Sequence, residues 1–103
     1  MKILLTCCIG MSTSLLAETM RQSALEQHRD DTIDVLDIEK AEEVLTDYDV
    51  VLLAPQLKHM YKRLVEDYGQ TIPIAMIDNK SYGTLDGTKV LNDTIKMMKK
   101  SCE

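Results

Sequence analysis

The stretch CCIGMSTS, residues 7–14, places two cysteines, a glycine and three hydroxyl side chains directly after the short apolar run KILLT. This order predicts a loop between a β-strand and a helix, where the first backbone N–H groups of the helix have no partner within it. Such donors and the helix dipole favour an anion, and Gly10 lets the backbone approach it closely. Hydroxyls that could cap the helix or bind the anion follow at Ser12, Thr13 and Ser14. Cys7 is therefore a candidate nucleophile toward an anionic electrophile such as phosphorus.

A structural interpretation of the same residues stays open. Cysteine is a small, often buried side chain that commonly ends a strand, and Ser-Thr-Ser is an ordinary start to a helix. On residue types alone, neither a functional nor a structural Cys7 is favoured. A functional Cys7 suggests three chemistries: a cysteine-dependent phosphatase, thiol redox chemistry, or a relay that holds a phosphoryl group for a second acceptor.

Neighbouring residues separate these three chemistries. A Cys-x5-Arg phosphatase loop needs an arginine where this chain has Thr13, and the nearest arginine, Arg21, lies well into the expected helix. Such a charged clamp contributes orders of magnitude to the rate. A disulfide between Cys7 and Cys8 would close a strained ring, which disfavours redox chemistry. A relay must avoid fast hydrolysis, so the missing arginine favours the relay.

Four short apolar runs alternate with four helix-like segments along the chain. The expected strands are Lys2–Thr6, Ile33–Ile38, Val50–Ala54 and Ile74–Ile77. The expected helices are Thr13–His28, Lys40–Thr46, Gln56–Tyr68 and Asp86–Lys99. Strict alternation predicts an α/β fold with a parallel sheet, right-handed crossovers and helices on both faces.

Ligands of such sheets bind beyond the carboxyl ends of the strands. The expected loops at that edge are residues 7–12, 55–56 and 78–87. We therefore expect Pro55 and Gln56 to line the site from a neighbouring strand end. Tyr82 could close over the opening loop with its hydroxyl, or form a hydrophobic lid over the core.

Three further residues that could do chemistry are given structural roles. His28 is expected near the end of the first helix, where a cation suits the helix dipole. His59 could be a second phosphoryl carrier or a proton shuttle, but a partly exposed helix residue is favoured. Asp78 is conceivable as a general acid, but aspartates commonly cap turns, and that role is favoured.

Length and charge exclude several classes of protein. A chain of 103 residues can form one compact domain, residues 1–103, with its own core. Its net charge of −5 argues against nucleic acid or an anionic membrane surface as the main partner. No stretch is long and apolar enough to cross a bilayer, and MKILLTCC is too short for a signal peptide. We therefore expect a cytoplasmic protein.

The cysteines indicate free thiols. Cys7, Cys8 and Cys102 are odd in number and two are adjacent, which does not suit a disulfide framework. Neither a Cys-x-x-Cys pair nor a His-rich tract accompanies them, so a zinc site is not expected. We expect no metal and no other cofactor.

Three motifs together carry a family resemblance: CxxGMSTSLL in the opening stretch, LLxPQ after the third expected strand, and IDxxxYGxxDGxxVL before the last helix. In these motifs the chain resembles the IIB component of the lactose/cellobiose/chitobiose family of the bacterial sugar phosphotransferase system. The resemblance spans almost the whole chain, and GMSTSLL combined with YGxxDG is more specific than either alone. Three positions depart from the family's usual residues without removing a part that the relay needs: Cys8, Ala54 and His59.

The resemblance implies a four-stranded parallel sheet in the order 2-1-3-4 with helices on both faces, an open twisted sandwich. It also implies a protein-phosphocysteine–sugar phosphotransferase component. In that family a phosphohistidine of IIA phosphorylates the IIB cysteine, which then phosphorylates a disaccharide during its transport by membrane-embedded IIC. The acceptor is then Cys7. The residues that hold the phosphoryl group, chiefly through backbone N–H groups, are then Cys8, Ile9, Gly10, Met11, Ser12, Thr13 and Ser14.

Partners and location follow from the same resemblance. IIA and IIC would reach one loop in turn, and IIC would recruit the protein to the inner face of the membrane. Ile9 and Met11 would form an apolar rim for this docking. Because IIC binds the sugar, cellobiose, chitobiose, lactose and related β-glucosides stay open. Separately, the lack of an obvious spare apolar face in the sequence favours a monomer. The alternatives are a regulatory module phosphorylated at Cys7, a low-activity cysteine phosphatase or a thiol-redox protein.

Overall fold

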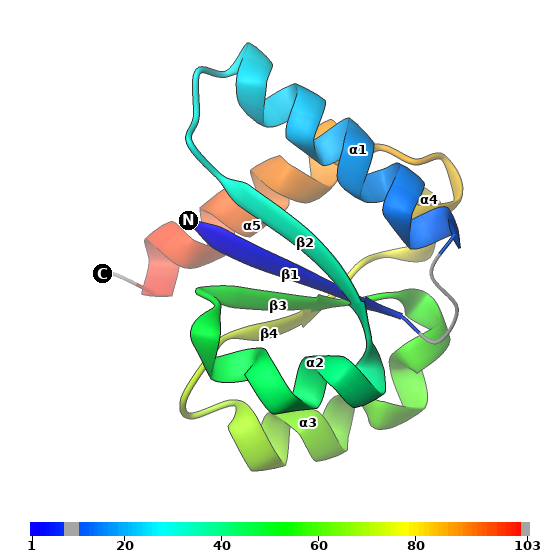
Figure 1. The fold of residues 1–103 in the computed structure, drawn as a ribbon, viewed down its shortest axis with the longest axis vertical. Helices are drawn as coiled ribbons and strands as arrows, with labels where there is room; N and C mark the ends of the chain where they lie inside the picture. Colours follow the sequence, from blue (N-terminus) through cyan, green and yellow to red (C-terminus); the bar gives the residue numbers. More distant parts are fainter. Residues whose placement is uncertain (8–10, 102–103) are drawn as a thin grey trace.

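A four-stranded parallel sheet forms the centre of the computed structural model (Figure 1), which describes residues 1–7 and 11–101, without the side chains of residues 11, 12, 100 and 101. The strands are β1 (Lys2–Cys7), β2 (Thr32–Asp37), β3 (Val50–Leu53) and β4 (Ile74–Met76). They lie in the order β2-β1-β3-β4, and every pair is parallel. The predicted α/β class, sheet type and strand order are confirmed.

Helices cover both faces of this sheet. In the described residues they are α1 (Met11–Glu26), α2 (Ile38–Val44), η1 (Leu45–Asp47), η2 (Pro55–Met60), α3 (Tyr61–Tyr68), α4 (Asn79–Gly83) and α5 (Gly87–Ser101), where η marks a 3-10 helix. Figure 1 shows α1 and α5 on one face and α2 and α3 on the other. The short helix α4 lies beside the start of α1, near the carboxyl ends of the strands.

Strand β1 is buried on both faces because its side chains alternate between two apolar clusters. Ile3 and Leu5 pack in the cluster that includes α1 and α5, and Leu4 packs in the cluster that includes α2 and α3. All three side chains are fully buried. Since β1 also pairs with a strand on each edge, it is fixed from four directions.

The first helix ends two residues earlier than predicted. Glu26 is its last residue, and His28 adopts a left-handed conformation with φ of 57°. The Arg29 N–H donates to the Ala24 carbonyl at 2.9 Å, and the His28 N–H donates to the Leu25 carbonyl at 3.1 Å. These bonds form the Schellman closure of a helix, with His28 at the position that glycine usually occupies. The predicted structural role of His28 thus belongs to the helix closure.

Two other helices also differ from the predicted bounds. Helix α2 begins at Ile38 rather than Lys40, because the Asp37 carboxylate accepts the Lys40 N–H at 3.0 Å and caps the helix directly after β2. The predicted helix Gln56–Tyr68 is divided into η2 and α3, with a non-helical backbone at Leu57.

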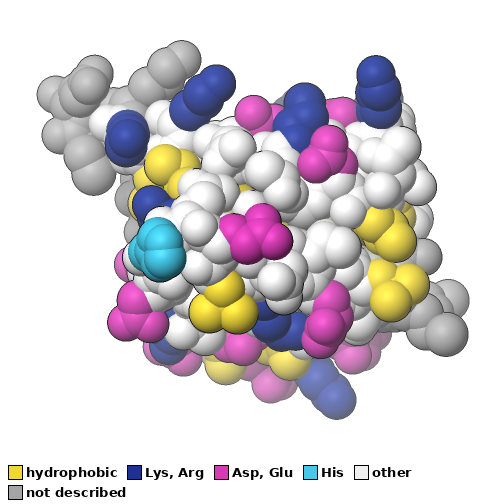
Figure 2. Space-filling model, turned by 90° about the horizontal axis from the view of Figure 1, so that it is seen from above, with side chains coloured by type: hydrophobic (Ala, Val, Ile, Leu, Met, Phe, Trp, Pro, Cys, Tyr) yellow, Lys and Arg dark blue, Asp and Glu magenta, His cyan; other side chains and the backbone are white. Residues whose placement is uncertain are grey.

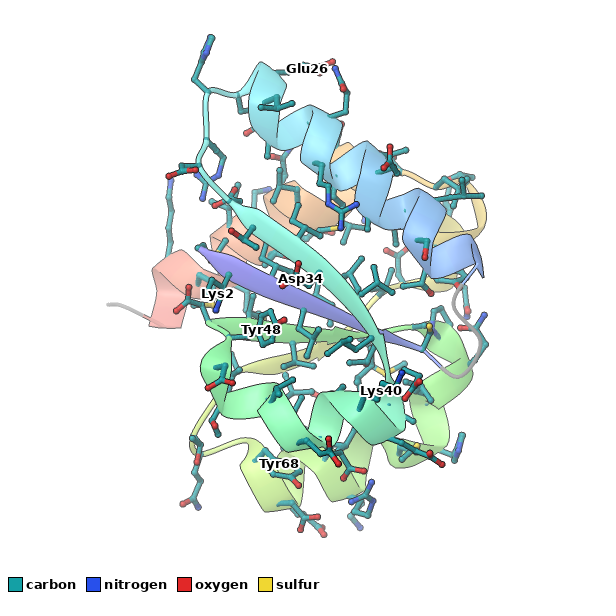
Figure 3. The ribbon with its side chains drawn as sticks, viewed as in Figure 1. Lys2, Glu26, Asp34, Lys40, Tyr48 and Tyr68 are labelled. Carbon is teal, nitrogen blue, oxygen red and sulfur yellow. The ribbon has the colours of Figure 1, made fainter. Side chains whose placement is uncertain are left out.

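Polar contacts join the strands near their amino ends, at the side of the sheet away from Cys7. Figure 3 shows Lys2, Asp34 and Tyr48 gathered there. The Tyr48 hydroxyl donates to Asp34 at 2.8 Å, and the Lys2 ammonium lies 5.2 Å from the centre of the Tyr48 ring. Burial, followed by the contact with Asp34, raises the pKa of Tyr48 to about 12. Because these three side chains contact one another, we assign the cluster a structural role.

Helices α1 and α5 approach closely at Gly87. A Cβ atom at this position would overlap the Thr19 side chain and the backbone nitrogen of Met20. Gly87 is buried, whereas a Cβ at Gly83, in α4, would meet no heavy atom within 4 Å. The start of α5 can therefore lie against α1 only because residue 87 has no side chain.

We expect Gly87→Ala to lower the free energy of unfolding by about 1–3 kcal/mol or more, because backbone atoms cannot move aside as side chains do. The matched control is Gly83→Ala, which should change stability by less than about 1 kcal/mol, with stabilisation the expected direction. Urea unfolding followed by circular dichroism measures both. Equal stability of the two variants would contradict this account of the α1–α5 contact.

Candidate active site

Cys7 is the last residue of β1, whereas the sequence predicted it to be the first residue of a loop. Its side chain is on the same face as Ile3 and Leu5, because alternate residues of a strand share a face. Only 1% of Cys7 is exposed. The difference from prediction has a simple cause: Cys7 pairs in register with Asp37 of β2, so the strand continues one residue further.

The first turn of α1 begins at Met11, so residues 11–14 are helical where a loop was predicted as far as Ser12. Thr13 is fully buried and Ser14 is exposed. The first turn carries no acidic side chain, so no carboxylate within that turn neutralises its N–H groups or the positive end of the helix dipole. Cys8, Ile9 and Gly10 lie outside the described residues, as do the side chains of Met11 and Ser12.

A groove between α1 and β2 reaches the buried thiol. This α1–β2 groove has a volume of about 600 Å³ and is lined by Cys7, Ser14, Leu15, Glu18, Arg21, Val35, Leu36 and Asp37. Leu15, one of these lining residues, is 56% exposed. A reactant that enters the groove could thus approach Cys7 from the α1 side of the sheet.

Arg21 shares this groove with Cys7, although fourteen positions separate them in the chain. Its guanidinium is held elsewhere: both Nε and Nη2 donate to the Ile33 carbonyl of the edge strand β2, with Nε at 3.0 Å. Its Nη1 also lies 3.8 Å from a Glu18 carboxylate oxygen. Arg21 therefore protects the edge of β2 and is not directed at the sulfur.

Tyr82 and Thr13 are brought together by the fold. The Tyr82 hydroxyl lies 2.9 Å from the Thr13 hydroxyl, a hydrogen bond between residues 69 positions apart that joins α4 to the first turn of α1. Tyr82 also packs against the core cluster on this face. The ring thus packs on the core and the hydroxyl contacts the first turn of α1, while the closure of Tyr82 over the opening loop stays a prediction.

Helix α4, Asn79–Gly83, lies within residues 78–87, a segment that the sequence predicted to be a loop. Asp78 caps it by accepting the Ser81 N–H at 3.1 Å, which confirms the structural role favoured for Asp78. Leu85 then closes the helix in a left-handed conformation, φ 55°. The Asp86 N–H donates to the Ser81 carbonyl at 2.9 Å, and the Leu85 N–H donates to the Tyr82 carbonyl at 3.2 Å. A cap at each end thus holds Tyr82 in place.

The two residues predicted to line the site from the end of β3 are not in the lining of the α1–β2 groove. Pro55 begins η2 and lines a second groove, on the β4 side, that does not include Cys7. Gln56 and His59 are both exposed, and for His59 this agrees with the expectation of a partly exposed helix residue. The α1–β2 groove instead takes its second wall from the end of β2, which had not been predicted. The available signal was the strand order, since β2 neighbours β1.

Two further findings apply to the described residues. No helix in residues 1–7 and 11–101 is long and apolar enough to span a bilayer. Within the same part of the chain, no group of three or more His, Cys, Asp or Glu side chains is placed to hold a metal ion.

The fold is that of an α/β protein with a parallel sheet, and Cys7 ends one of its central strands, before helix α1. The family model described as "PTS system, Lactose/Cellobiose specific IIB subunit" matches residues 2–93. The chain belongs to this family of phosphotransferase-system components, which carry phosphoryl groups for sugar uptake and act with IIA and IIC components.

Individual relatives agree with this assignment. The chain is 35% identical to the oligo-beta-mannoside-specific EIIB component of Bacillus subtilis, over 94% of this chain and 95% of the relative. It is 33% identical to the galactose-specific EIIB component of Lactococcus lactis, over 86% and 88%. The cellobiose-specific IIB structure from Borrelia burgdorferi matches with 41% identity and a TM-score of 0.78, covering 93% and 89%. The lactose-specific IIB domain from Streptococcus pneumoniae has a TM-score of 0.83 at 20% identity, covering 93% and 95%, and supports the fold.

The cap of α4 gives a pH-dependent prediction. Contacts with the Ser81 side chain and backbone N–H, and then the Lys89 ammonium, lower the pKa of Asp78. A lowered pKa in the folded state means that the ionised carboxylate stabilises the fold above its unfolded pKa of about 4, and that this contribution is lost as pH falls through the folded pKa.

We expect Asp78→Ala to lower the free energy of unfolding at neutral pH by about 1 kcal/mol, and Asp78→Asn to lower it less, because asparagine also caps helices well. At a pH below the folded pKa of Asp78, the difference between wild type and Asp78→Ala should shrink. Urea titrations at several pH values measure this. A difference that stayed constant down to strongly acidic pH would contradict the ionised cap.

Proposed function

We propose that this protein carries a phosphoryl group on Cys7 between a phosphohistidine of IIA and a disaccharide transported by IIC, of the cellobiose, chitobiose or lactose type. The observation that carries the proposal is the position of Cys7, at the end of a central strand and in the lining of the α1–β2 groove. We also propose that the protein works in the cytoplasm as a monomer and meets IIC at the inner face of the membrane.

The chemistry is an in-line displacement at phosphorus. The sulfur of Cys7 forms an S–P bond as the N–P bond of phosphohistidine breaks, and the freed imidazole takes up the proton that the thiol loses. The three equatorial oxygens would be held by backbone N–H groups of residues 8–14, including the first turn of α1. In the second step a sugar hydroxyl forms an O–P bond as the S–P bond breaks, and the proton that the hydroxyl loses regenerates the thiol.

The state of Arg21 supports a carrier over a phosphatase. Its guanidinium is bonded to the Ile33 carbonyl, so it is not available as a clamp on a phosphoryl group. Without a cationic clamp the transition state for hydrolysis has less stabilisation, and a phosphocysteine would persist until an acceptor arrives.

The first test is intact-protein mass spectrometry after incubation with phosphoenolpyruvate and the upstream relay proteins, IIA included. Wild type should gain one phosphoryl group, Cys8→Ser should gain it as well, and Cys7→Ser should gain none. A wild type that gains no phosphoryl group from a demonstrably phosphorylated IIA would refute the proposal. Retention of the group in Cys7→Ser and its loss in Cys8→Ser would move the carrier to the second thiol.

We further expect Tyr82 to position the first turn of α1. Tyr82→Phe leaves the buried Thr13 hydroxyl without the phenol, at a cost of about 1–3 kcal/mol of stability, and should slow phosphoryl transfer to Cys7 roughly three- to tenfold. The matched control is Tyr48→Phe, which also loses one hydrogen bond but at the amino edge of the sheet. Rapid-quench transfer rates that fell equally in both variants would indicate a stability effect and contradict positioning by Tyr82.

A further inference from the structure

A second groove lies at the same edge of the sheet as Cys7, on the far side of β3. It has a volume of about 480 Å³ and is lined by Pro55, Lys58, Tyr61, Lys62, Met76, Ile77, Asp78 and Asn79; we call it the basic groove. Pro55 follows the end of β3, and Asp78 lies just beyond the end of β4. Because β3 neighbours β1, this groove and the α1–β2 groove flank the carboxyl edge from its two sides.

The two lysines of the basic groove, Lys58 in η2 and Lys62 in α3, differ in their ion pairing from the neighbouring Arg63. Lys58 and Lys62 are exposed, and neither has an ion pair within the described part of the chain. Arg63, the next residue, is bonded to Glu42 at 2.9 Å and lies 3.3 Å from Asp67. Arg63 is therefore neutralised within the protein, whereas Lys58 and Lys62 pair with no acidic side chain of the described residues.

The one acidic side chain that lines the groove is already engaged. The Asp78 carboxylate caps α4 through the Ser81 N–H and lies 3.6 Å from the Lys89 ammonium. The remaining lining is largely apolar, with Tyr61 37% exposed beside Pro55. In a chain with a net charge of −5, this groove is a local positive site with an apolar floor.

The α1–β2 groove has the opposite character. Its single cation, Arg21, is tied to Glu18 and to the Ile33 carbonyl, and Asp37 adds a second carboxylate. Figure 2 views the molecule from the α1 side and shows acidic and basic side chains mixed, with hydrophobic ones in separate patches. Charge therefore distinguishes the two sides of the carboxyl edge.

We propose that the basic groove docks an acidic surface of the phosphorylated IIA donor, so that its phosphohistidine is presented to Cys7 across the end of β3. This inference rests on the proposed function. A protein interface covers about 800 Å² on each partner, so a docked donor need not be confined to one groove. The donor is a separate diffusing protein, and complementary charge raises the rate of productive encounters most for such a partner.

The test is the second-order rate constant for phosphoryl transfer from phosphorylated IIA to this protein, measured by rapid quench at several salt concentrations. Reversing the charge in Lys58→Glu/Lys62→Glu should lower the rate constant at low salt roughly tenfold and weaken its dependence on salt. The rate at saturating donor should stay near that of wild type, because these lysines act in docking and not on the phosphoryl group.

The matched control is Lys96→Glu/Lys99→Glu, which makes the same change in net charge on exposed residues of the last turns of α5. Its rate constant should stay within about twofold of wild type. Circular dichroism and urea unfolding confirm that both variants are folded. Lys58→Ala/Lys62→Ala, which adds no repulsion, should give a smaller loss in the same direction.

Three results would overturn the inference. One is an unchanged rate constant and salt dependence in Lys58→Glu/Lys62→Glu. Another is an equal loss in the α5 control, which would indicate that net charge acts without a docking site. The third is normal transfer from IIA but impaired sugar phosphorylation with IIC-containing membrane vesicles, which would assign the groove to the acceptor. A wild type that takes no phosphoryl group at all fails in the earlier mass-spectrometry test and refutes the proposed function itself.

Discussion

The position of β1 is the constraint on which the rest of this structure depends. The strand is paired on both edges and packed on both faces, so the place and direction of its last residue are determined by four sets of contacts. Cys7 is that residue. In the proposed relay Cys7 meets two successive partners, and with such a support it does not have to be ordered anew for each transfer.

The α1 face shows how the surroundings of Cys7 are built from residues distant in sequence. Gly87 lets α5 lie against α1, and the capped helix α4 between β4 and α5 brings Tyr82 to Thr13 in the first turn of α1. The first contact restrains the middle of α1, and the second restrains its first turn, where unpaired N–H groups and the helix dipole favour an anion. The left-handed Leu85 stores some backbone strain at this point, and its packing against the core offsets that strain.

Charge divides the carboxyl edge into two unlike sides. Cys7 is in the lining of the α1–β2 groove, and the one arginine of that lining is bonded to the Ile33 carbonyl. This arrangement suits the proposed role of holding a phosphoryl group without hydrolysing it. The basic groove keeps two lysines outside any ion pair of the described chain. A carrier needs both properties, because slow hydrolysis preserves the intermediate while rapid, selective encounters keep the relay moving.

The sequence by itself determined the alternation of strands and helices, the parallel sheet, and Cys7 as the candidate nucleophile. These follow from local signals: apolar runs, helical spacing, and a cysteine and glycine before a run of hydroxyls. The resemblance carried by GMSTSLL and YGxxDG supplied the strand order and the family. Tertiary structure decided the extension of β1 to Cys7, helix α4, the Thr13–Tyr82 hydrogen bond and the lining of both grooves. The physical reason is that strand pairing sets where β1 ends, five residues are too few to show helical periodicity, and contacts between residues 69 positions apart leave no local pattern.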